Sequence, residues 1–134
     1  MCEAVYLYVE DDPLSQEIMK MIVSFGLAAS QLTVFTNSHN FMARVKALVP
    51  EPTVFLLDIH IEPHNGFELL KMLREDPQFK ACPIIALTAS VMNEEVAQLR
   101  RSGFDGAIGK PLSVQTFPKL MKRILDGESV WHIA

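Results

Sequence analysis

Five short apolar runs alternate with five segments of helical periodicity along this chain of 134 residues. Each run is apolar on both of the faces that a strand would present. Such strands are typical of a parallel sheet buried between two layers of helices. The alternation therefore predicts an α/β fold with a five-stranded parallel sheet and helices on both faces. The expected strands are Val5–Val9, Leu32–Phe35, Thr53–Leu57, Pro83–Leu87 and Gly106–Gly109.

Start and stop signals bound the helices between these runs. Asp12 followed by Pro13 is a typical helix start, and Gly26 is a typical stop. In that first helix one face carries Leu14, Ile18, Met21, Ile22 and Phe25. The later helices are expected from Asn37 or Ser38 to Pro50, from Gly66 to Arg74, from Asn93 to Gly103 and from Ser113 to Gly127.

Composition excludes several classes of function. The chain has 16 acidic and 12 basic residues, which argues against a dedicated nucleic-acid binder. It has no apolar run of membrane-spanning length, and no basic stretch of a secretory signal. Its two cysteines, Cys2 and Cys82, are expected to be reduced thiols of a cytoplasmic protein. We expect one domain over residues 1–134, with a core of about 4–126 and an apolar tail at 127–134.

Chemically active side chains stand where the expected strands end. The carboxyl ends of parallel strands share one edge of the sheet, which is where ligands bind in such folds. Three carboxylates would meet there, and a divalent cation would balance their repulsion. All the donors are oxygens, which suits Mg²⁺, with Mn²⁺ as the alternative. The residues at this edge are Glu10, Asp11, Asp12, Asp58, Thr88, Ala89 and Lys110.

Asp12 is better used as the helix cap, so Glu10 and Asp11 remain for the metal beside Asp58. The second oxygen of Asp58 is then free to act as a nucleophile toward a phosphoryl group. Lys110 would neutralise that group, and the Thr88 hydroxyl and the Ala89 amide would hydrogen-bond it.

Together these residues resemble the receiver domain of two-component response regulators over roughly Ala4–Leu125. The motifs that carry the resemblance are VYLYVEDDP (Val5–Pro13), FLLDIHIEPHNGFELL (Phe55–Leu70), PIIALTA (Pro83–Ala89) and GKPL (Gly109–Leu112). The resemblance implies a flavodoxin-like, doubly wound sheet with strand order 2-1-3-4-5. It also implies transfer of a phosphoryl group from the phosphohistidine of a sensor histidine kinase or phosphotransfer protein to an aspartate.

Carried over by position, the resemblance makes Asp58 the phosphoacceptor. Glu10, Asp11 and Asp58 would hold Mg²⁺, together with the backbone carbonyl of His60. Thr88 would be the switch hydroxyl. Lys110 would bind the phosphoryl group and precede a cis peptide bond to Pro111. The domain would promote its own phosphorylation and dephosphorylation, and is classed as a signalling switch and not as an enzyme.

Three positions differ in their interest from the rest: Ala107, His60 and Ser90. Many receivers carry Tyr or Phe three residues before the lysine, where this chain has Ala107. We hypothesise that Ala107 leaves a pocket near Thr88 for a partner side chain, the alternative being a shallow dent without function. His60 and Ser90 occupy positions that influence the lifetime of the phosphate in this family.

Other functions remain as alternatives. A pseudo-receiver would bind a downstream protein constitutively, and only Ala107 favours it. An aspartate-nucleophile phosphohydrolase would need a second acid where His60 stands, and a flavin-binding fold would need a Ser/Thr-rich loop after the first strand. The domain could also come from a larger hybrid kinase, although Met1 and a complete last helix favour a single natural domain.

Several remaining features have ordinary explanations. The spacing of the four histidines does not favour a transition-metal site. The basic residues of the last two helices are expected on a solvated face, with partner docking as the alternative: Arg100, Arg101, Lys119, Lys122 and Arg123. The tail Val130–Ala134 either folds back on the domain or joins a homodimer contact.

Overall fold

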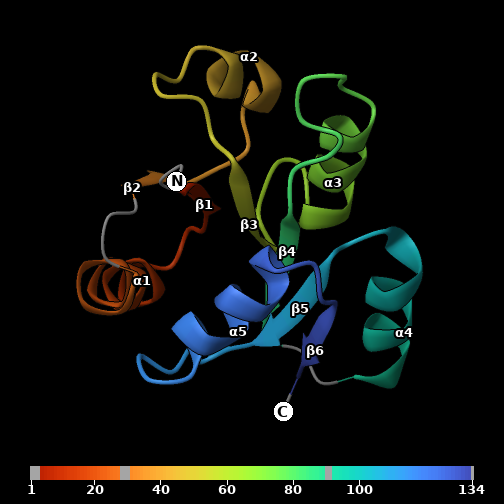
Figure 1. Cartoon of the computed structure of the whole chain (residues 1–134). Coiled ribbons are helices and arrows are strands. Elements are labelled where there is room, and N and C mark those ends of the chain that lie inside the picture. Colours follow the sequence, from red (N-terminus) through yellow and green to blue (C-terminus); the bar gives the residue numbers. More distant parts are fainter. Residues whose placement is uncertain (1–3, 28–30, 90–91, 134) are drawn as a thin grey trace.

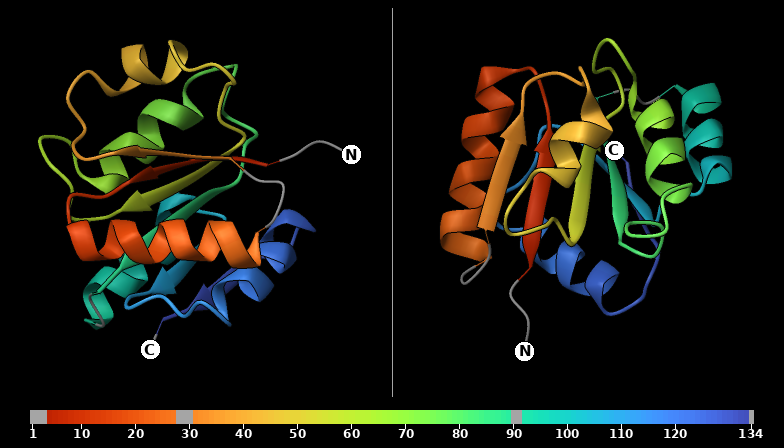
Figure 2. Two further views of the ribbon diagram at one scale, coloured as in Figure 1. Left: turned by 90° about the vertical axis from the view of Figure 1, so that its left-hand side faces the viewer. Right: turned by 90° about the horizontal axis from the view of Figure 1, so that it is seen from above.

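The computed structural model describes residues 4–27, 31–89 and 92–133 as a parallel sheet with helices on both faces (Figures 1 and 2). The predicted α/β class and the order 2-1-3-4-5 are confirmed, but the sheet has a sixth strand, giving β2-β1-β3-β4-β5-β6. The strands are β1 (Val5–Val9), β2 (Gln31–Phe35), β3 (Val54–Asp58), β4 (Ile84–Thr88), β5 (Gly106–Gly109) and β6 (Val130–His132). The helices are α1 (Pro13–Gly26), α2 (Phe41–Lys46), α3 (Gly66–Arg74), α4 (Asn93–Ser102) and α5 (Phe117–Leu125).

The sixth strand comes from the apolar tail, so the expected core boundary near residue 126 was too short. β6 pairs in parallel with β5 and places Val130 beside Gly106 and Trp131 beside Ala107. Burying Val130 and half-burying Trp131 removes apolar surface from water, which favours this return of the chain. Of the two fates expected for the tail, the structure shows the fold-back on its own domain.

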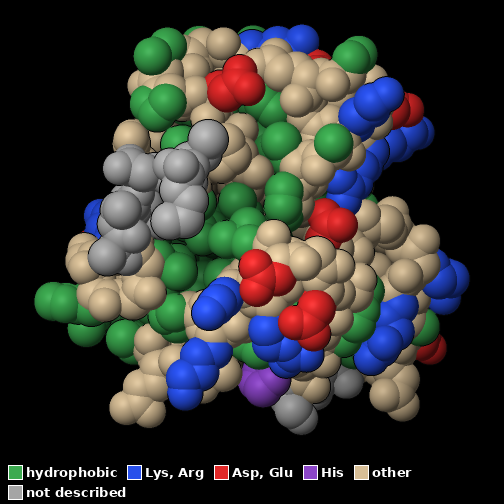
Figure 3. Space-filling view, in the orientation of Figure 1, with side chains coloured by type: hydrophobic (Ala, Val, Ile, Leu, Met, Phe, Trp, Pro, Cys, Tyr) green, Lys and Arg blue, Asp and Glu red, His purple; other side chains and the backbone are tan. Residues whose placement is uncertain are grey.

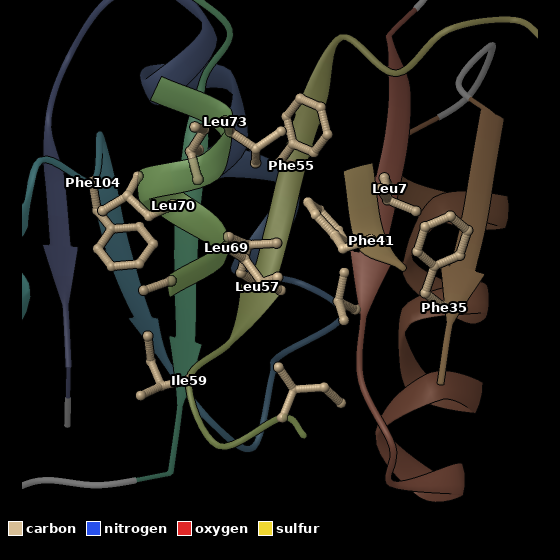
Figure 4. Packing of buried hydrophobic residues seen from close by; sticks show 14 of the residues in the cluster. Leu7, Phe35, Phe41, Phe55, Leu57, Ile59, Leu69, Leu70, Leu73 and Phe104 are labelled. Atoms are coloured by element: carbon tan, nitrogen blue, oxygen red, sulfur yellow. The ribbon is translucent and has the colours of Figure 1, made fainter. Parts of the chain in front are cut away.

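The sheet separates two apolar layers, because successive side chains of each strand point to opposite faces. In β1, Leu7 and Val9 face the layer under α2, α3 and α4, whereas Tyr6 and Tyr8 face the layer under α1 and α5. Figure 4 shows the first layer, in which Leu69 and Leu73 of α3 pack onto β3. Burial on both sides of the sheet explains why its strands are apolar runs.

Helix α1 starts and stops where the sequence predicts. The Asp12 carboxylate accepts from the backbone N–H of Ser15 at 2.9 Å, and Pro13 opens the helix. The buried side chains are Met19, Ile22 and Val23, so only part of the predicted apolar face turns inward. The arc of apolar side chains on α1 is wider than the strip that the sheet covers. The outer part of that arc is exposed: Leu14 at 69%, Met21 at 51% and Phe25 at 81%.

Two of the predicted helix starts, those of α2 and α5, were wrong by a few residues. Helix α2 begins after Asn40, which has a left-handed φ of 50°, because Asn37 and Ser38 bind other groups. The Asn37 carboxamide oxygen accepts from Arg44, and the Ser38 hydroxyl bonds the backbone of His64. Helix α5 begins at Phe117, although Ser113 Oγ accepts from the backbone N–H of Thr116 at 3.1 Å, the bond expected of a cap. Helix α4 begins at Asn93, within one residue of its predicted start.

The basic residues of α4 and α5 are exposed, as predicted for a solvated face. Figure 3 shows Lys and Arg side chains on this half of the molecule, interspersed with Asp and Glu side chains. Docking of a partner there stays untested. Within the described part of the chain, no helix has the length and apolar character that crossing a membrane requires.

Candidate functional site

The predicted strand-end residues meet around one cavity of about 400 Å³. The ends of β1, β3 and β5 supply its polar wall, and α1 with the segment after β5 supplies an apolar one. Because all the strands are parallel, their carboxyl ends bring together residues that are up to 100 positions apart in sequence. The lining residues are Glu10, Asp11, Asp12, Leu14, Ser15, Ile18, Asp58, His60, Ala89, Lys110, Pro111 and Leu112.

Glu10 is a fully buried carboxylate with its hydrogen-bonding capacity in use. One of its oxygens accepts from the Tyr8 hydroxyl at 2.9 Å and from the Lys110 ammonium at 2.7 Å. The other accepts from the backbone N–H of Asp12 at 3.3 Å. Burial works to raise the pKa of Glu10, but the proton that Asp58 can donate when it is protonated, and the hydrogen bond from the Lys110 ammonium, outweigh burial and keep the pKa below its ordinary value. Glu10 is therefore held as a carboxylate.

Asp58 lies at the end of β3 with 5% of its surface exposed. The backbone N–H of His60 donates to its Oδ1 at 3.2 Å, and Lys110 Nζ lies 3.6 Å from its Oδ2. Burial, followed by the neighbouring Glu10 carboxylate, raises the pKa of Asp58 to about 6. Near neutral pH the group is thus a carboxylate that is poorly compensated, and a cation beside it would be stabilising.

Lys110 follows β5 and bridges the two buried acids. Burial works to lower the pKa of Lys110, but the hydrogen bond to Glu10 and the charge of Asp58 raise it above its ordinary value. The ammonium is therefore charged at physiological pH. The Lys110–Pro111 peptide bond is cis, as expected.

The acidic residues fit a hard divalent cation. Glu10, Asp11 and Asp58 each offer a carboxylate oxygen, and these oxygens lie within 4.8 Å of one another. Asp11 is exposed at the cavity rim, so a cation bound there would keep contact with water, as Mg²⁺ prefers. Among the described residues this is the one group of His, Cys, Asp and Glu side chains arranged to hold a metal.

The Thr88 hydroxyl has a partner that the sequence did not predict. Thr88 ends β4, but its Oγ1 donates to Oε1 of Glu95 on α4 at 3.2 Å. His60 Nε2 lies 3.1 Å from the same Glu95 oxygen. Ala89 is exposed and lines the cavity, which suits the contact that its amide is predicted to make. Ser90, the other position expected to influence the lifetime, lies outside the described residues, as does Cys2.

Sequence reasoning missed three residues of this site: Tyr8, Gln16 and Glu95. Tyr8 and Gln16 hold Glu10 from β1 and α1, the latter through the Glu10 carbonyl at 2.7 Å. Successive side chains of a strand point to opposite faces, so Tyr8 and Glu10 share one face of β1 and their contact could have been predicted. No comparable signal exists for Glu95, because its approach to Thr88 depends on how α4 packs against the sheet.

Ala107 has no exposed surface and belongs to the core layer under α4. Its partner across the β5–β6 pair is Trp131, whose ring packs against the same layer. A partner side chain thus has no direct access to Ala107. The hypothesis of an open pocket at this position is not supported by the structure, and the aromatic nearest to Ala107 along the sheet comes from the tail.

Comparison with known proteins gives one consistent result. Residues 6–124 match the family profile described as the response regulator receiver domain. The polar-differentiation response regulator DivK of Brucella ovis is 29% identical over 119 residues, covering 89% of this chain and 94% of DivK.

Solved structures have the same fold. The chemotaxis response regulator CheY4 of Vibrio cholerae superposes with a TM-score of 0.77 and 22% identity, covering 92% of this chain and 99% of CheY4. The receiver domain of sensor histidine kinase PA1611 from Pseudomonas aeruginosa gives 0.80 and 17%, covering 94% and 100%. Since the family profile spans most of the chain, this protein belongs to the response regulator receiver domain family of two-component systems.

Proposed function

We propose that this protein is a phosphorylation-dependent signalling switch in which Asp58 accepts the phosphoryl group. The observation that carries the proposal is Asp58 itself, a nearly buried carboxylate opening to the cavity with Lys110 and two further acids around it. A purely structural acid at a strand end would not need a buried lysine and an acidic pair beside it. A sensor histidine kinase or phosphotransfer protein would be the donor, in the cytoplasm, and a downstream protein would be the recipient of the signal.

In the proposed reaction an Asp58 oxygen attacks the phosphorus of a phosphohistidine. The new O–P bond forms as the P–N bond breaks, and the electron pair of that bond returns to the imidazole nitrogen of the donor. Lys110 lies 3.6 Å from Asp58 Oδ2, where its charge balances the negative phosphoryl oxygens. Hydrolysis would later release phosphate and restore the Asp58 carboxylate.

Glu10, Asp11 and Asp58, with the carbonyl of His60, would hold Mg²⁺ in this site, and Mn²⁺ is the alternative. When bound, the cation supplies charge neutralisation to the phosphoryl oxygens. The solved PA1611 receiver has a magnesium ion coordinated in its active-site cleft, which supports the same assignment here.

The exposed side chains Leu14, Met21 and Phe25 of α1 support a docking site for the donor. Leu14 also lines the cavity, together with Ile18 of the same helix. The exposed side chains therefore continue the apolar wall of the cavity away from Asp58. An apolar stripe along a helix suits packing against a helix of another protein. The donor would thus be held beside the nucleophile.

Intact mass after incubation with acetyl phosphate tests the proposal. The parent chain should gain one phosphoryl group in Mg²⁺ and none in excess chelator, and Asp58→Asn should gain none. Asp12→Asn is the matched control, because Asn caps a helix as well as Asp does and the substitution removes a neighbouring acid. That variant should be phosphorylated like the parent.

An adduct that persists in Asp58→Asn would place the phosphoryl group elsewhere and contradict the proposal. Absence of any adduct could also reflect rapid hydrolysis, so Mg²⁺ and beryllium fluoride, a stable phosphoryl mimic, should be titrated as well. Failure of the parent to bind the mimic would instead favour a constitutive interaction module.

A further inference from the structure

Glu95 in the first turn of α4 joins three parts of the fold through one carboxylate oxygen. Its Oε1 accepts from the Thr88 hydroxyl at 3.2 Å and lies 3.1 Å from His60 Nε2. The side chain is 19% exposed, so water competes only weakly for these contacts. The start of α4 is thereby attached to the end of β4 and to the segment that follows Asp58.

The Thr88 hydroxyl has a single proton to donate. It can donate that proton to Glu95, or to an oxygen of a phosphoryl group on Asp58, but not to both. Phosphorylation of Asp58 and the Thr88–Glu95 bond therefore oppose each other.

Helix α4 buries little apolar surface. Its one buried side chain among the described residues is Leu99. Near its C-terminal end, the Arg100 guanidinium lies 5.1 Å from the centre of the Trp131 ring on β6. An element that buries so little apolar surface depends on its polar contacts for its position.

We propose that Glu95 is a positioning residue that keeps the Thr88 hydroxyl away from the phosphoryl site, and that phosphorylation releases α4 by taking the proton that Thr88 gives to Glu95. The inference rests on the proposed function of Asp58. It provides a route from the site to α4 that needs no aromatic side chain at position 107. Helix α4 is then the element that exchanges between two positions, one with the Thr88–Glu95 bond and one without it.

Calorimetric titration with beryllium fluoride in Mg²⁺ measures the first consequence. Glu95→Ala should bind the mimic about threefold to tenfold more tightly than the parent, the equivalent of one competing hydrogen bond removed. Glu95→Gln retains an acceptor for Thr88 and should lie between the two. Glu94→Ala is the matched control, because Glu94 is an exposed acid in the same helical turn and should leave the affinity unchanged.

Trp131 is the only tryptophan of the chain and reports on α4 through Arg100. In the parent and in Glu94→Ala, binding of the mimic should change the Trp131 emission as α4 moves. In Glu95→Ala the emission without the mimic should already resemble that of the bound parent, so the change should be lost. Circular dichroism of each variant checks that the fold is kept.

A double-mutant cycle separates this mechanism from a general effect of charge. In a Thr88→Ala background, Glu95→Ala should no longer tighten binding. The proposal is overturned if Glu95→Ala matches Glu94→Ala in affinity or emission, or if its effect persists without the Thr88 hydroxyl. A parent chain that fails to bind the mimic at all would overturn the proposed function, and this inference with it.

Discussion

At the scale of single residues, the site is a balance between buried charges. Glu10 and Asp58 are both buried, and one ammonium group, that of Lys110, serves them both. The environment drives their pKa values apart: Glu10 stays below its ordinary value, while the pKa of Asp58 rises to about 6. The first acid is therefore a fixed negative charge, and the second is the one whose charge is incompletely balanced.

Lys110→Met should lower the free energy of unfolding by about 2–4 kcal/mol at pH 7.5, because two buried carboxylates lose their counter-charge. The pKa of Glu10 is lowered in the folded parent, so the stability that Lys110 supplies is present above the ordinary carboxylate pKa and is lost as pH falls through the folded value. The loss should be smaller at pH 4 than at pH 7.5, because Asp58, with its pKa of about 6, is then protonated and needs no counter-charge. Urea unfolding without metal at both pH values measures it.

Lys122→Met, on the exposed face of α5, is the control and should stay within about 0.5 kcal/mol of the parent. An equal loss at both pH values for Lys110→Met would mean that its aliphatic chain, and not its charge, stabilises the site.

At the scale of elements, the sequence predicted well where polar residues follow apolar strands. Glu10, Asp58 and Lys110 were predicted to meet because parallel strands end at one edge. The unpredicted contacts depend on tertiary packing. Glu95 reaches Thr88 only because of where α4 is placed. The face that α1 turns inward depends on which part of its wide apolar arc packs on the sheet. Similarly, the strand at Val130–His132 has only three residues, too few for a periodic pattern.

Gly106→Ala should detach β6 from the sheet. A Cβ at this position would lie 2.6 Å from the backbone oxygen of Val130, so the two strands would have to separate. We expect a loss of about 1–3 kcal/mol in the free energy of unfolding and a red shift of the Trp131 emission as the ring becomes more exposed.

Deleting residues 129–134 provides the comparison for this variant. In the shortened chain Gly106→Ala has no β6 to displace, so it should cost much less. A similar cost in both chains would show that the added methyl group disturbs α5, where Ile124 Cδ1 is the next nearest atom at 3.3 Å.

At the scale of the whole molecule, the apolar stripe of α1 adjoins the cavity, whereas the exposed basic side chains of α4 and α5 belong to helices that do not line it. A donor must approach the cavity to reach Asp58, whereas a protein that responds to α4 need not. The arrangement therefore separates the proposed input surface from the proposed output element.

Phe25→Ser and Met21→Ser should each slow phosphorylation by a phosphohistidine-bearing protein by about tenfold, as expected for exposed apolar anchors of an interface. Phosphorylation by acetyl phosphate should not change, since neither side chain lines the cavity. Leu125→Ser, an exposed leucine on α5, is the matched control. Initial rates of phosphoryl transfer measure the effect, and equal rates for all variants would remove α1 as the docking surface.

The sixth strand also changes how this molecule can meet its own copies. An edge strand leaves a row of backbone N–H and C=O groups unpaired, and such a row is a template for adding strands from another chain. In this fold β6 covers one side of β5 and moves that edge outward to a strand of three residues. The opposite edge, β2, has five. Self-association by extension of the sheet is thus disfavoured at the C-terminal side, and the tail protects the molecule from polymerising there.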